Sequence, residues 1–315
     1  MSVRHQNTDT LRSQTQSSSD PEQHSPNGPP RLALLSNGVS PHNDNHQRIT
    51  DALQQDGWEV SVFSHSSLAM MEQTVCAGAT PLDTFDLVWM LGLGEQYDFL
   101  DRCQILNNLP PEKLVNSPMA TAFFHSKHAN LPHSPLTFTG SSPKDLVAAA
   151  TRHPEVAQWV VKPSAGSYGR GVVLVSTADN LERTLKSSTK DGRYCVLQAY
   201  VEEIVSGETR SLWVNGSIIG SYLRIPDRNF LANLSQGARP RPVILDSQQV
   251  SKIQDIGNYL SNNGIRFAAI DMAFPWLIEI NVANPGGLAT LSTLESSTKP
   301  SVNQRLAQAL RTLLN

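Results

Sequence analysis

One short segment near the carboxyl end, Phe267–Asn281, predicts two strands joined by a turn at Pro275. Alternate residues of a strand share one face, so Glu279 and Asn281 point the same way, and a turn centred on Pro275 places Asp271 opposite Glu279. The sequence therefore gathers two carboxylates and an amide oxygen between apolar flanks. Magnesium prefers such oxygen ligands, and like charges are costly to bury together without a cation between them. The alternative interpretation is an amphipathic hairpin with a polar outer face.

Composition limits the class of protein to which this hairpin belongs. The chain has 315 residues, a formal net charge of -3 and 39% hydrophobic residues, which is enough for one to three domains with a real core. Its weak acidity argues against a general nucleic-acid binder. No apolar run approaches the roughly 18 residues that span a membrane, and no secretory signal is visible. The three cysteines (Cys76, Cys103 and Cys195) are far apart, which fits a reducing compartment. We therefore expect a cytoplasmic protein without membrane or nucleic-acid partners.

The first 118 residues divide into a polar extension and a region in which strands and helices alternate. Residues 1–30 are rich in Ser, Gln, Asn, Asp and Pro, and we expect them to be disordered because they cannot bury enough surface to offset the entropy of ordering. From Arg31 the pattern predicts an α/β layer with a parallel sheet. Its expected elements are strands at Leu32–Leu35, Trp58–Phe63 and Phe85–Leu91 and a helix at Asn45–Asp56.

The rest of the chain mixes strands and helices in a less regular order. We expect helices at Met119–Ala129, Ser247–Asn262 and Pro300–Leu314, strands at Ser211–Arg224, Ala268–Phe274 and Leu277–Val282, and strands with one helix between Trp159 and about Tyr200. The stretch Ile225–Pro242 contains Arg, Pro, Gly and Asn without periodicity and predicts a long loop. Such loops are often functional or mobile.

A glycine-rich turn follows the expected strand Trp159–Pro163. Gly166, Gly169 and Gly171 let the backbone approach a ligand closely and turn its N–H groups toward phosphate oxygens, and Lys162 adds a positive charge beside them. The turn is neither a Walker A loop nor a dinucleotide fingerprint, because strands flank it on both sides and no Gly-Lys-Ser/Thr opens a helix. The alternative is a tight hairpin beside a snorkelling lysine.

Two further segments carry polar groups at strand ends. Cys195–Val201 predicts an apolar strand that runs into a linker, where backbone groups and Gln198 could contact an adenine edge; an ordinary inter-domain strand is the alternative. Glu208 and Arg210 are two residues apart and share a strand face, and the planar guanidinium of Arg210 suits a carboxylate or a phosphate. The alternative for these two residues is a solvent-exposed salt-bridge pair.

The order of these features resembles the ATP-grasp superfamily, and within it prokaryotic glutathione synthetase most closely. The resemblance spans about Arg31 to Leu314 and is strongest in Tyr194–Arg241 and Gly264–Val282. The segments that carry it are Arg193-Tyr194-Cys195, Gly207-Glu208-Thr209-Arg210, Leu223-Arg224-Ile225-Pro226, Asn233-Leu234-Ser235-Gln236-Gly237, Arg239-Pro240-Arg241-Pro242 and Ile278-Glu279-Ile280-Asn281-Val282. Together these segments are specific, whereas any one of them alone is not.

The resemblance implies an α/β fold that is α+β in its carboxyl-terminal part. In this ATP-grasp fold, a disordered extension at 1–30 precedes a doubly wound N-terminal domain at 31–118. A lid subdomain with the glycine-rich loop would follow at 119–198. A mixed-sheet subdomain with the metal site would occupy residues 199–315.

The resemblance also implies a role for individual residues around the nucleotide. Lys127 and Lys162 would hold the phosphates, and Glu208 would lie near the ribose. The lid over the phosphates would be formed by Gly166, Ser167, Tyr168, Gly169 and Gly171, and the adenine pocket by Gln198, Ala199 and Val201. Magnesium, with manganese as an alternative, would be held by Asp271, Glu279 and Asn281.

The resemblance implies substrate-binding residues and a reaction in the same way. Arg210 would face the acyl substrate or the reacting phosphate, and Arg224, Arg239 and Arg241 would lie in or beside a water-excluding loop at Ile225–Pro242. Further substrate contacts would come from Asn233, Asn284, Gly286 and Gly287. In the family, ATP phosphorylates the carboxylate of γ-glutamylcysteine, and the amine of glycine attacks the acyl phosphate to form glutathione. The expected partners are small carboxylate and amine substrates, and a homo-oligomer stays open because bacterial relatives are often multimers.

Two segments depart from the family pattern. Met90–Gln96 has no Arg or Lys where the family usually has Arg-Lys-Asp-Pro-Pro, and Ala283–Gly287 replaces the usual Thr-Ser-Pro-Thr. Both segments contact substrate in the family, so a ligase for a different acid and amine is an alternative, and a non-catalytic nucleotide-binding module is a second. The retained charges at the expected nucleotide and metal residues argue against the second alternative. A dinucleotide-dependent oxidoreductase is disfavoured because Ser36–Ser40 lacks the fingerprint.

Overall fold

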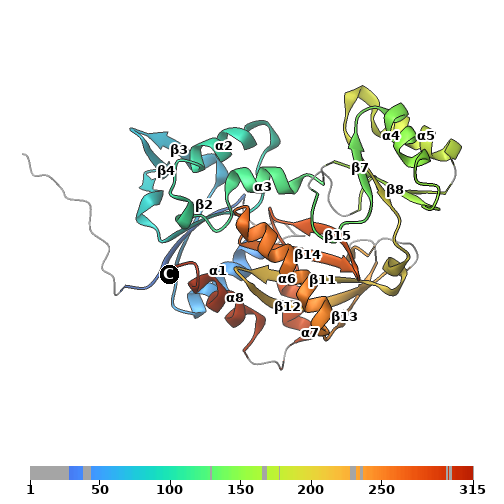
Figure 1. Cartoon of the computed structure of the whole chain (residues 1–315). Helices are drawn as coiled ribbons and strands as arrows, with labels where there is room; N and C mark the ends of the chain where they lie inside the picture. The colour runs from blue at the N-terminus through green and yellow to red at the C-terminus, as the bar shows by residue number, and fades with distance from the viewer. Residues whose placement is uncertain are drawn as a thin grey trace, which may run out of the picture.

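The computed structural model describes residues 28–37, 44–127, 130–164, 169–176, 178–227, 232–234, 237–295, 297 and 300–314. Within these ranges the chain combines four sheets with α-helices in an α/β arrangement (Figure 1). This is the class that the alternation of strands and helices predicts. The predicted disorder of the N-terminal extension concerns residues that, up to residue 27, lie outside the described ranges.

A parallel three-stranded sheet opens the described chain. It consists of β1 (Arg31–Leu35), β2 (Glu59–Phe63) and β6 (Leu87–Met90) in the order β2-β1-β6. Alternate residues of β1 enter two different cores. Leu32 and Leu34 share a core with helix α1 (Asn45–Gln55), whereas Ala33 and Leu35 pack on the other face. Because both faces are covered, β1 is apolar from Leu32 to Leu35.

The second face of this sheet is covered by elements that the sequence pattern did not reveal. They are a small antiparallel sheet of β3 (Leu68–Met71), β4 (Thr74–Ala77) and β5 (Thr80–Pro81), and helix α2 (Phe99–Leu106). Strands of 2 to 4 residues are too short to display a period-two pattern. Helix α3 (Pro118–His125) then begins at the N-cap Ser117, whose hydroxyl accepts the Ala120 N–H. The predicted extension of this helix to Ala129 is wrong, because the helix ends at His125.

A four-stranded sheet forms a separate lobe, which lies at the upper right of Figure 1. Its order is β7-β10-β8-β9, and its elements are β7 (Thr137–Gly140), α4 (Pro143–Thr151), β8 (Trp159–Pro163), β9 (Val173–Val175), α5 (Ala178–Ser188) and β10 (Cys195–Ala199). Strands β8 and β9 pair antiparallel, so the glycine-rich turn does join two strands, as the sequence predicts. The lobe has a core of its own, centred on Trp159, Val161, Leu185 and Leu197.

A five-stranded antiparallel sheet forms the centre of the molecule. Its order is β13-β12-β11-β14-β15, made of β11 (Glu208–Val214), β12 (Ser217–Ile225), β13 (Arg239–Pro242), β14 (Phe267–Ala273) and β15 (Trp276–Asn281). Helices α6 (Ser247–Asn262), α7 (Leu288–Leu294) and α8 (Val302–Arg311) complete this region. Helix α6 has the predicted bounds and starts with a capping box between Asp246 and Gln249. Helix α7 was not predicted.

Two predictions for this sheet are wrong. The expected single strand Ser211–Arg224 is a hairpin, because Asn215 and Gly216 take positive φ angles of 39° and 91° and form a two-residue turn. The expected loop Ile225–Pro242 is partly a strand, because β13 pairs with β12 through Arg241 opposite Leu223. Pairing partners far away in the sequence order this segment, and its composition does not reveal them.

The β14–β15 hairpin has the predicted pairing of Asp271 with Glu279, although the turn differs from the predicted one. Ala273 pairs with Trp276, so the turn is tighter than one centred on Pro275. Ile278 then has no partner, and this β-bulge restores the register so that Asp271 faces Glu279.

The N-terminal sheet and the five-stranded sheet share one hydrophobic core. Leu32 and Trp89 from the first belong to the same cluster as Leu212 and Phe267 from the second. Buried Asn116 connects the two sheets with four hydrogen bonds: its Nδ2 donates to the carbonyls of Phe267 (2.9 Å) and Val282 (3.1 Å), and its Oδ1 accepts the N–H groups of Arg266 and Phe267 (2.8 Å each). None of the helices in the described ranges has the length and apolar character that a membrane crossing requires.

Candidate functional site

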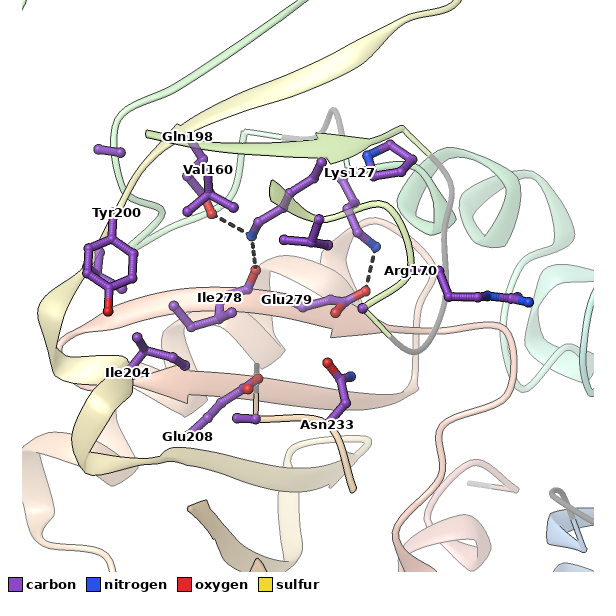
Figure 2. A pocket seen from close by; sticks show the side chains of 17 residues that line it. Lys127, Val160, Arg170, Gln198, Tyr200, Ile204, Glu208, Asn233, Ile278 and Glu279 are labelled. Carbon is purple, nitrogen blue, oxygen red and sulfur yellow. Dashed lines mark hydrogen bonds and ion pairs between the residues drawn. The ribbon is translucent and has the colours of Figure 1, made fainter. Parts of the chain in front are cut away.

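A cavity lies where the four-stranded lobe meets the five-stranded sheet. Figure 2 shows that its walls come from β8 and β10 on one side and from β15 and the start of β11 on the other. Tyr200 and Ile204 lie toward one end of the cavity, whereas Lys127 and Glu279 lie toward the other (Figure 2). The cavity therefore offers an apolar end and a charged end, as a molecule with a planar base and phosphate groups requires.

Two lysines occupy the charged end. Lys127 Nζ lies 2.5 Å from Glu279 Oε1, and Lys162 Nζ donates to Gln198 Oε1 at 2.7 Å and approaches the Ile278 carbonyl at 3.5 Å. Burial disfavours the ammonium form of Lys162 and lowers its pKa to about 8, although nearby Glu279 opposes this shift. Both predicted phosphate-binding lysines thus line one cavity, although they are 35 positions apart in the sequence.

The apolar end contains predicted and unpredicted residues. Ala199 and Val201 line it, as the resemblance implies. Gln198 lines it too, but its side chain is occupied, because its Oε1 accepts from Lys162 and its Nε2 donates to Thr137 at 2.9 Å. The lining residues that the sequence did not single out are Val160, Tyr200, Ile204, Ala232 and Ile278. Val160 and Ile278 could have been found from their strands, since each precedes a predicted site residue by one or two positions.

A buried ionic cluster of Glu208, Arg210, Arg224 and Asp271 lies on one face of the five-stranded sheet. Arg210 donates to both oxygens of Asp271, from Nε to Oδ1 at 2.8 Å and from Nη2 to Oδ2 at 2.6 Å. Arg224 Nη2 lies 2.9 Å from Asp271 Oδ2 and 2.7 Å from Glu208 Oε1. The alternative of a solvent-exposed Glu208–Arg210 pair is therefore wrong, because Glu208 is buried, Arg210 is only 13% exposed, and each pairs with another residue.

The four groups of this cluster perturb one another. Burial raises the pKa of Glu208 to about 7, and Arg224 opposes this shift. Burial also raises the pKa of Asp271, but the guanidinium groups of Arg210 and Arg224 outweigh it and hold the pKa below its usual range. Asp271 thus remains a carboxylate in a fully buried position, neutralised by two arginines.

The predicted oxygen ligands are neighbours, as the hairpin register requires. Asp271 faces Glu279, and Asn281 Nδ2 donates to Asp271 Oδ2 at 3.2 Å. This leaves the amide oxygen of Asn281 and the second oxygen of Glu279 for a ligand. In the described ranges no three His, Cys, Asp or Glu side chains gather as a metal site would require, so the set consists of two acids and one amide.

The glycine-rich turn is described in part. Gly166, Ser167 and Tyr168 lie outside the described residues. Gly169 lines the cavity, and Gly171, with φ +73°, packs so closely that a Cβ there would lie 3.0 Å from Pro163.

The arginines predicted to contact substrate lie in two different places. Arg224 belongs to the buried cluster, whereas Arg239 and Arg241 are exposed on the edge strand β13. They pair opposite Ile225 and Leu223, so they lie on the other face of the sheet from Arg224, and Arg239 forms an ion pair with Asp227. Asn233, from the middle of the expected loop, does line the cavity (Figure 2).

The segment 283–287 connects the ionic cluster to the N-terminal sheet. The Gly286 carbonyl accepts from Arg210 Nη1 at 3.3 Å, and Asn284 Oδ1 accepts from Asn45 Nδ2 at 2.7 Å. Asn45 Nδ2 also donates to the Pro285 carbonyl at 3.1 Å, and Gly287 is the N-cap residue before helix α7. The two segments that depart from the family pattern thus meet, since the Gly92 N–H donates to the Ala283 carbonyl at 2.7 Å.

Comparison with known proteins agrees with this architecture. Residues 128–296, slightly more than half of the chain, match the family described as prokaryotic glutathione synthetase, ATP-grasp domain. A glutathione synthetase of Prochlorococcus marinus (strain MIT 9313) is 30% identical over 242 residues, which is 74% of this chain and 77% of that protein. The crystal structure of the D-cycloserine synthetase DcsG shares 20% identity and a TM-score of 0.65 over 90% of this chain and 100% of its own. The ATP-grasp ligase PsnB, solved with a minimal precursor, shares 16% identity and a TM-score of 0.62 over 90% of this chain and 98% of its own.

Proposed function

Because this chain belongs to the prokaryotic glutathione synthetase family of ATP-grasp ligases, we propose that it uses ATP to join the carboxylate of one small molecule to the amine of another. The acid is first phosphorylated to an acyl phosphate, which the amine then attacks, so that an amide, ADP and phosphate are formed. The observation that carries the proposal is the meeting of Lys127, Lys162 and Glu279 in one cavity, directly beside the Arg210–Asp271 pair.

The two ends of the cavity suit ATP in a defined orientation. The adenine would lie at the apolar end among Tyr200, Val201 and Ile204, and the phosphates at Lys127 and Lys162. In the free protein these lysines pair with Glu279 and Gln198. At Lys162 a phosphate would replace the amide oxygen of Gln198 as the stronger partner, because a charge-assisted bond to phosphate exceeds one to an amide.

The oxygen donors at this end fit magnesium. Glu279 and Asn281 would hold it together with phosphate oxygens, since magnesium is commonly bound by one or two carboxylates plus substrate phosphates. Asp271 remains a predicted third ligand, although both its oxygens accept hydrogen bonds from arginines in this structure. When bound, the cation would neutralise charge on the transferring phosphoryl group.

The reaction requires no nucleophile from the protein. The acid and the amine supply the reacting atoms, and the site contributes positioning, positive charge and the exclusion of water. Arg210 is placed to hold the reacting carboxylate, because its Nη1 already reaches out of the cluster to the Gly286 carbonyl.

Glutathione formation from γ-glutamylcysteine and glycine is the first candidate for the reaction. It is supported by the relatives that carry this name and cover most of the chain. A second candidate is a ligase for a different acid and amine. The absence of Lys and Arg from Met90–Gln96 and the replacement of Thr-Ser-Pro-Thr by Ala283–Gly287 favour it, and the two segments meet through the Gly92–Ala283 hydrogen bond.

Phosphate release from ATP and magnesium tests the proposal. The full chain is assayed with γ-glutamylcysteine plus glycine and with a panel of other acid and amine pairs. Turnover that depends on both an acid and an amine supports the ligase, and the preferred pair distinguishes the two candidates. If ATP binds but no pair releases phosphate, the proposal is overturned in favour of a nucleotide-binding module.

A further inference from the structure

A second cavity adjoins the one described above. Its volume is about 540 Å³, which is in the range of roughly 300–1,000 Å³ in which proteins bind small molecules. Every residue that lines it belongs to the described part of the chain. Five residues line both cavities and therefore form the wall between them: Lys127, Lys162, Gln198, Ile278 and Glu279.

One side of the second cavity is a face of the four-stranded lobe. Val196 of β10 pairs with Lys162 on β8 and with Thr139 on β7, and Gln198 pairs with Thr137. Paired residues of adjacent strands share a face, so these side chains form one surface with hydroxyl groups at β7 and a positive charge at Lys162. All of them line the second cavity.

The opposite side of the second cavity is mainly apolar. It consists of Phe124 near the end of α3, Leu131 and Leu136 before β7, and Leu277 and Ile280 of β15. Phe124, Leu131 and Leu277 are buried members of one core cluster, so packing holds this wall in place. A ligand in the second cavity can therefore bury an apolar body against a preformed surface.

Lys162 brings a positive charge without a counter-ion to the wall between the cavities. Its ammonium group donates to Gln198 Oε1 at 2.7 Å and approaches the Ile278 carbonyl at 3.5 Å, and both of these partners are uncharged (Figure 2). Among the described residues it has no ion pair, whereas Lys127 is neutralised by Glu279. A charge that is withdrawn from water without a counter-ion is costly, so Lys162 favours one negative charge on a ligand.

We propose that the second cavity binds a small organic monocarboxylic acid, with its carboxylate on Lys162 and its apolar body against Phe124, Leu136 and Ile280. The carboxylate would replace the amide oxygen of Gln198, because a hydrogen bond between two charged groups is stronger than one to an amide. A carboxylate and a phosphate on the same ammonium group repel each other. The acid would therefore inhibit the binding of ATP, and this consequence rests on the proposed function.

A matched pair of probes tests the binding of an acid. 4-Phenylbutyrate and 4-phenylbutyramide differ in charge but hardly in shape, and their Kd values for the full chain are measured by calorimetry at pH 7 without nucleotide. We expect the carboxylate to bind at least tenfold more tightly than the amide. Equal binding of the two probes, or no binding of 4-phenylbutyrate, overturns the inference.

Two tryptophan variants locate the bound probe. Leu136 lines the second cavity but not the first, and Val201 lines the first but not the second. Leu136→Trp should weaken the binding of 4-phenylbutyrate at least tenfold and leave the Kd of a non-hydrolysable ATP analogue unchanged. Val201→Trp should have the reverse effects. Loss of probe binding in Val201→Trp alone would place the acid in the first cavity and contradict the inference.

The positions of these variants allow a larger side chain. Leu136 is 37% exposed, so tryptophan can enter the cavity from its rim without repacking a core. Leu100→Trp, at a 60% exposed position of α2 that lines neither cavity, is the control and should change neither Kd. Melting temperatures like that of the parent show that the variants are folded.

A titration of the ATP analogue tests the competition. In the presence of saturating 4-phenylbutyrate, the apparent Kd of the analogue for the parent protein should rise at least fivefold. The rise should be absent in Leu136→Trp. An unchanged Kd of the analogue while the probe is bound would refute the sharing of Lys162 between the two ligands.

Phosphate release separates this inference from the proposed function. Binding of the probes as expected, without turnover for any pair of acid and amine, refutes the ligase and leaves the second cavity intact as a binding site. Turnover by a protein that does not bind 4-phenylbutyrate refutes the second cavity as a binding site and leaves the ligase intact.

Discussion

The five-stranded sheet is joined to the rest of the molecule in two different ways. We call its interface with the N-terminal sheet the dry joint, because this interface is apolar. Trp89 packs against Phe267 with ring centroids 4.9 Å apart, and both polar side-chain atoms of buried Asn116 bond to backbone groups. We call its interface with the four-stranded lobe the polar joint, because charged side chains and cavities lie in this interface. Lys127 and Lys162 cross it, and cavities lie on both sides of these lysines.

The second of those cavities, of about 540 Å³, shares Lys127, Lys162 and Glu279 with the first, which contains Tyr200 and Ile204 at its apolar end. The core of the four-stranded lobe, as far as the described residues show, includes no residue of the five-stranded sheet. Contacts at this joint are therefore charged side chains that can exchange partners with a ligand, whereas contacts at the dry joint cannot be exchanged without exposing apolar surface. The N-terminal sheet and the five-stranded sheet therefore form one apolar core, whereas the four-stranded lobe has its own core and meets them through charged side chains.

The ionic cluster belongs to the sheet that both joints share, and its loss should have the largest effect on stability. Asp271→Asn leaves Arg210 and Arg224 without their common carboxylate in a fully buried place. Removing one partner of a buried ion pair costs about 3–5 kcal/mol. We expect a fall of this size in the free energy of unfolding, measured with urea. The exposed pair of Asp255 with His133 provides the control, and Asp255→Asn should change it by less than about 1 kcal/mol. A small effect of Asp271→Asn would mean that the cluster is not a fixed part of the sheet.

A substitution at the polar joint should lower the rate of phosphate release far more than the free energy of unfolding. Glu279→Gln removes a charge that is only partly buried and pairs with Lys127, so the free energy of unfolding should change by less than about 1 kcal/mol. The rate of phosphate release should nevertheless fall by about 10²–10³-fold, as is typical when one charge-stabilising group is lost from an active site. Steady-state kinetics and urea unfolding of the same preparation provide both numbers.

The matched control for this variant is Glu295→Gln, because Glu295 forms a similarly half-buried ion pair with Arg305 away from the cavity. It should leave phosphate release unchanged. Near-normal turnover by Glu279→Gln would remove Glu279 from the proposed metal and nucleotide site.

The dry joint should respond in stability alone. Asn116→Ala leaves two carbonyls and two N–H groups of the β14–β15 region without their partner, and each buried unsatisfied group costs about 1–3 kcal/mol. We expect at least about 2 kcal/mol of destabilisation, because water can enter and relieve part of the cost. Asn108→Ala, which removes an exposed side chain bonded to helix carbonyls, should cost far less. Destabilisation of equal size in both variants would show that Asn116 does not hold the joint.

The sequence was sufficient to predict the parts of the site that depend on local periodicity. The facing of Asp271 and Glu279 follows from alternation along two short strands, and the position of Lys162 at a strand end follows from an apolar run before glycines. Helix α6 could be bounded because its capping box is a local pattern. Each of these features is set by residues within a few positions of one another.

The features that escaped prediction depend on residues far apart in the chain. Arg210 meets Asp271 across 61 positions, and Asn116 meets Phe267 across 151. No periodic pattern encodes such pairs, so no role was predicted for Asn116, and Arg210 was predicted only as a contact for a carboxylate or phosphate or as an exposed partner of Glu208. The edge strand β13 was missed for the same reason, since its proline-rich sequence forms a strand only because β12 lies beside it.

The smallest predicted effect is a pH dependence at the polar joint. Burial lowers the pKa of Lys162 to about 8 in the free protein, below the ordinary lysine value. As the pH rises through 8 this lysine loses its charge and its attraction for phosphate, whereas below pH 7 it is fully charged. Because kcat/KM reports ionisations of the free enzyme, kcat/KM for ATP should fall about tenfold between pH 7 and pH 9.

Lys162→Arg separates this cause from others, since a guanidinium keeps its charge throughout this range. The variant should have a lower kcat/KM at pH 7, because arginine does not fit the lysine position, but a flat profile up to pH 9. A profile in the variant that still falls at pH 8 would assign the ionisation to another group. Lys162 would then stay charged up to pH 9, and its burial would not weaken its attraction for phosphate in this pH range.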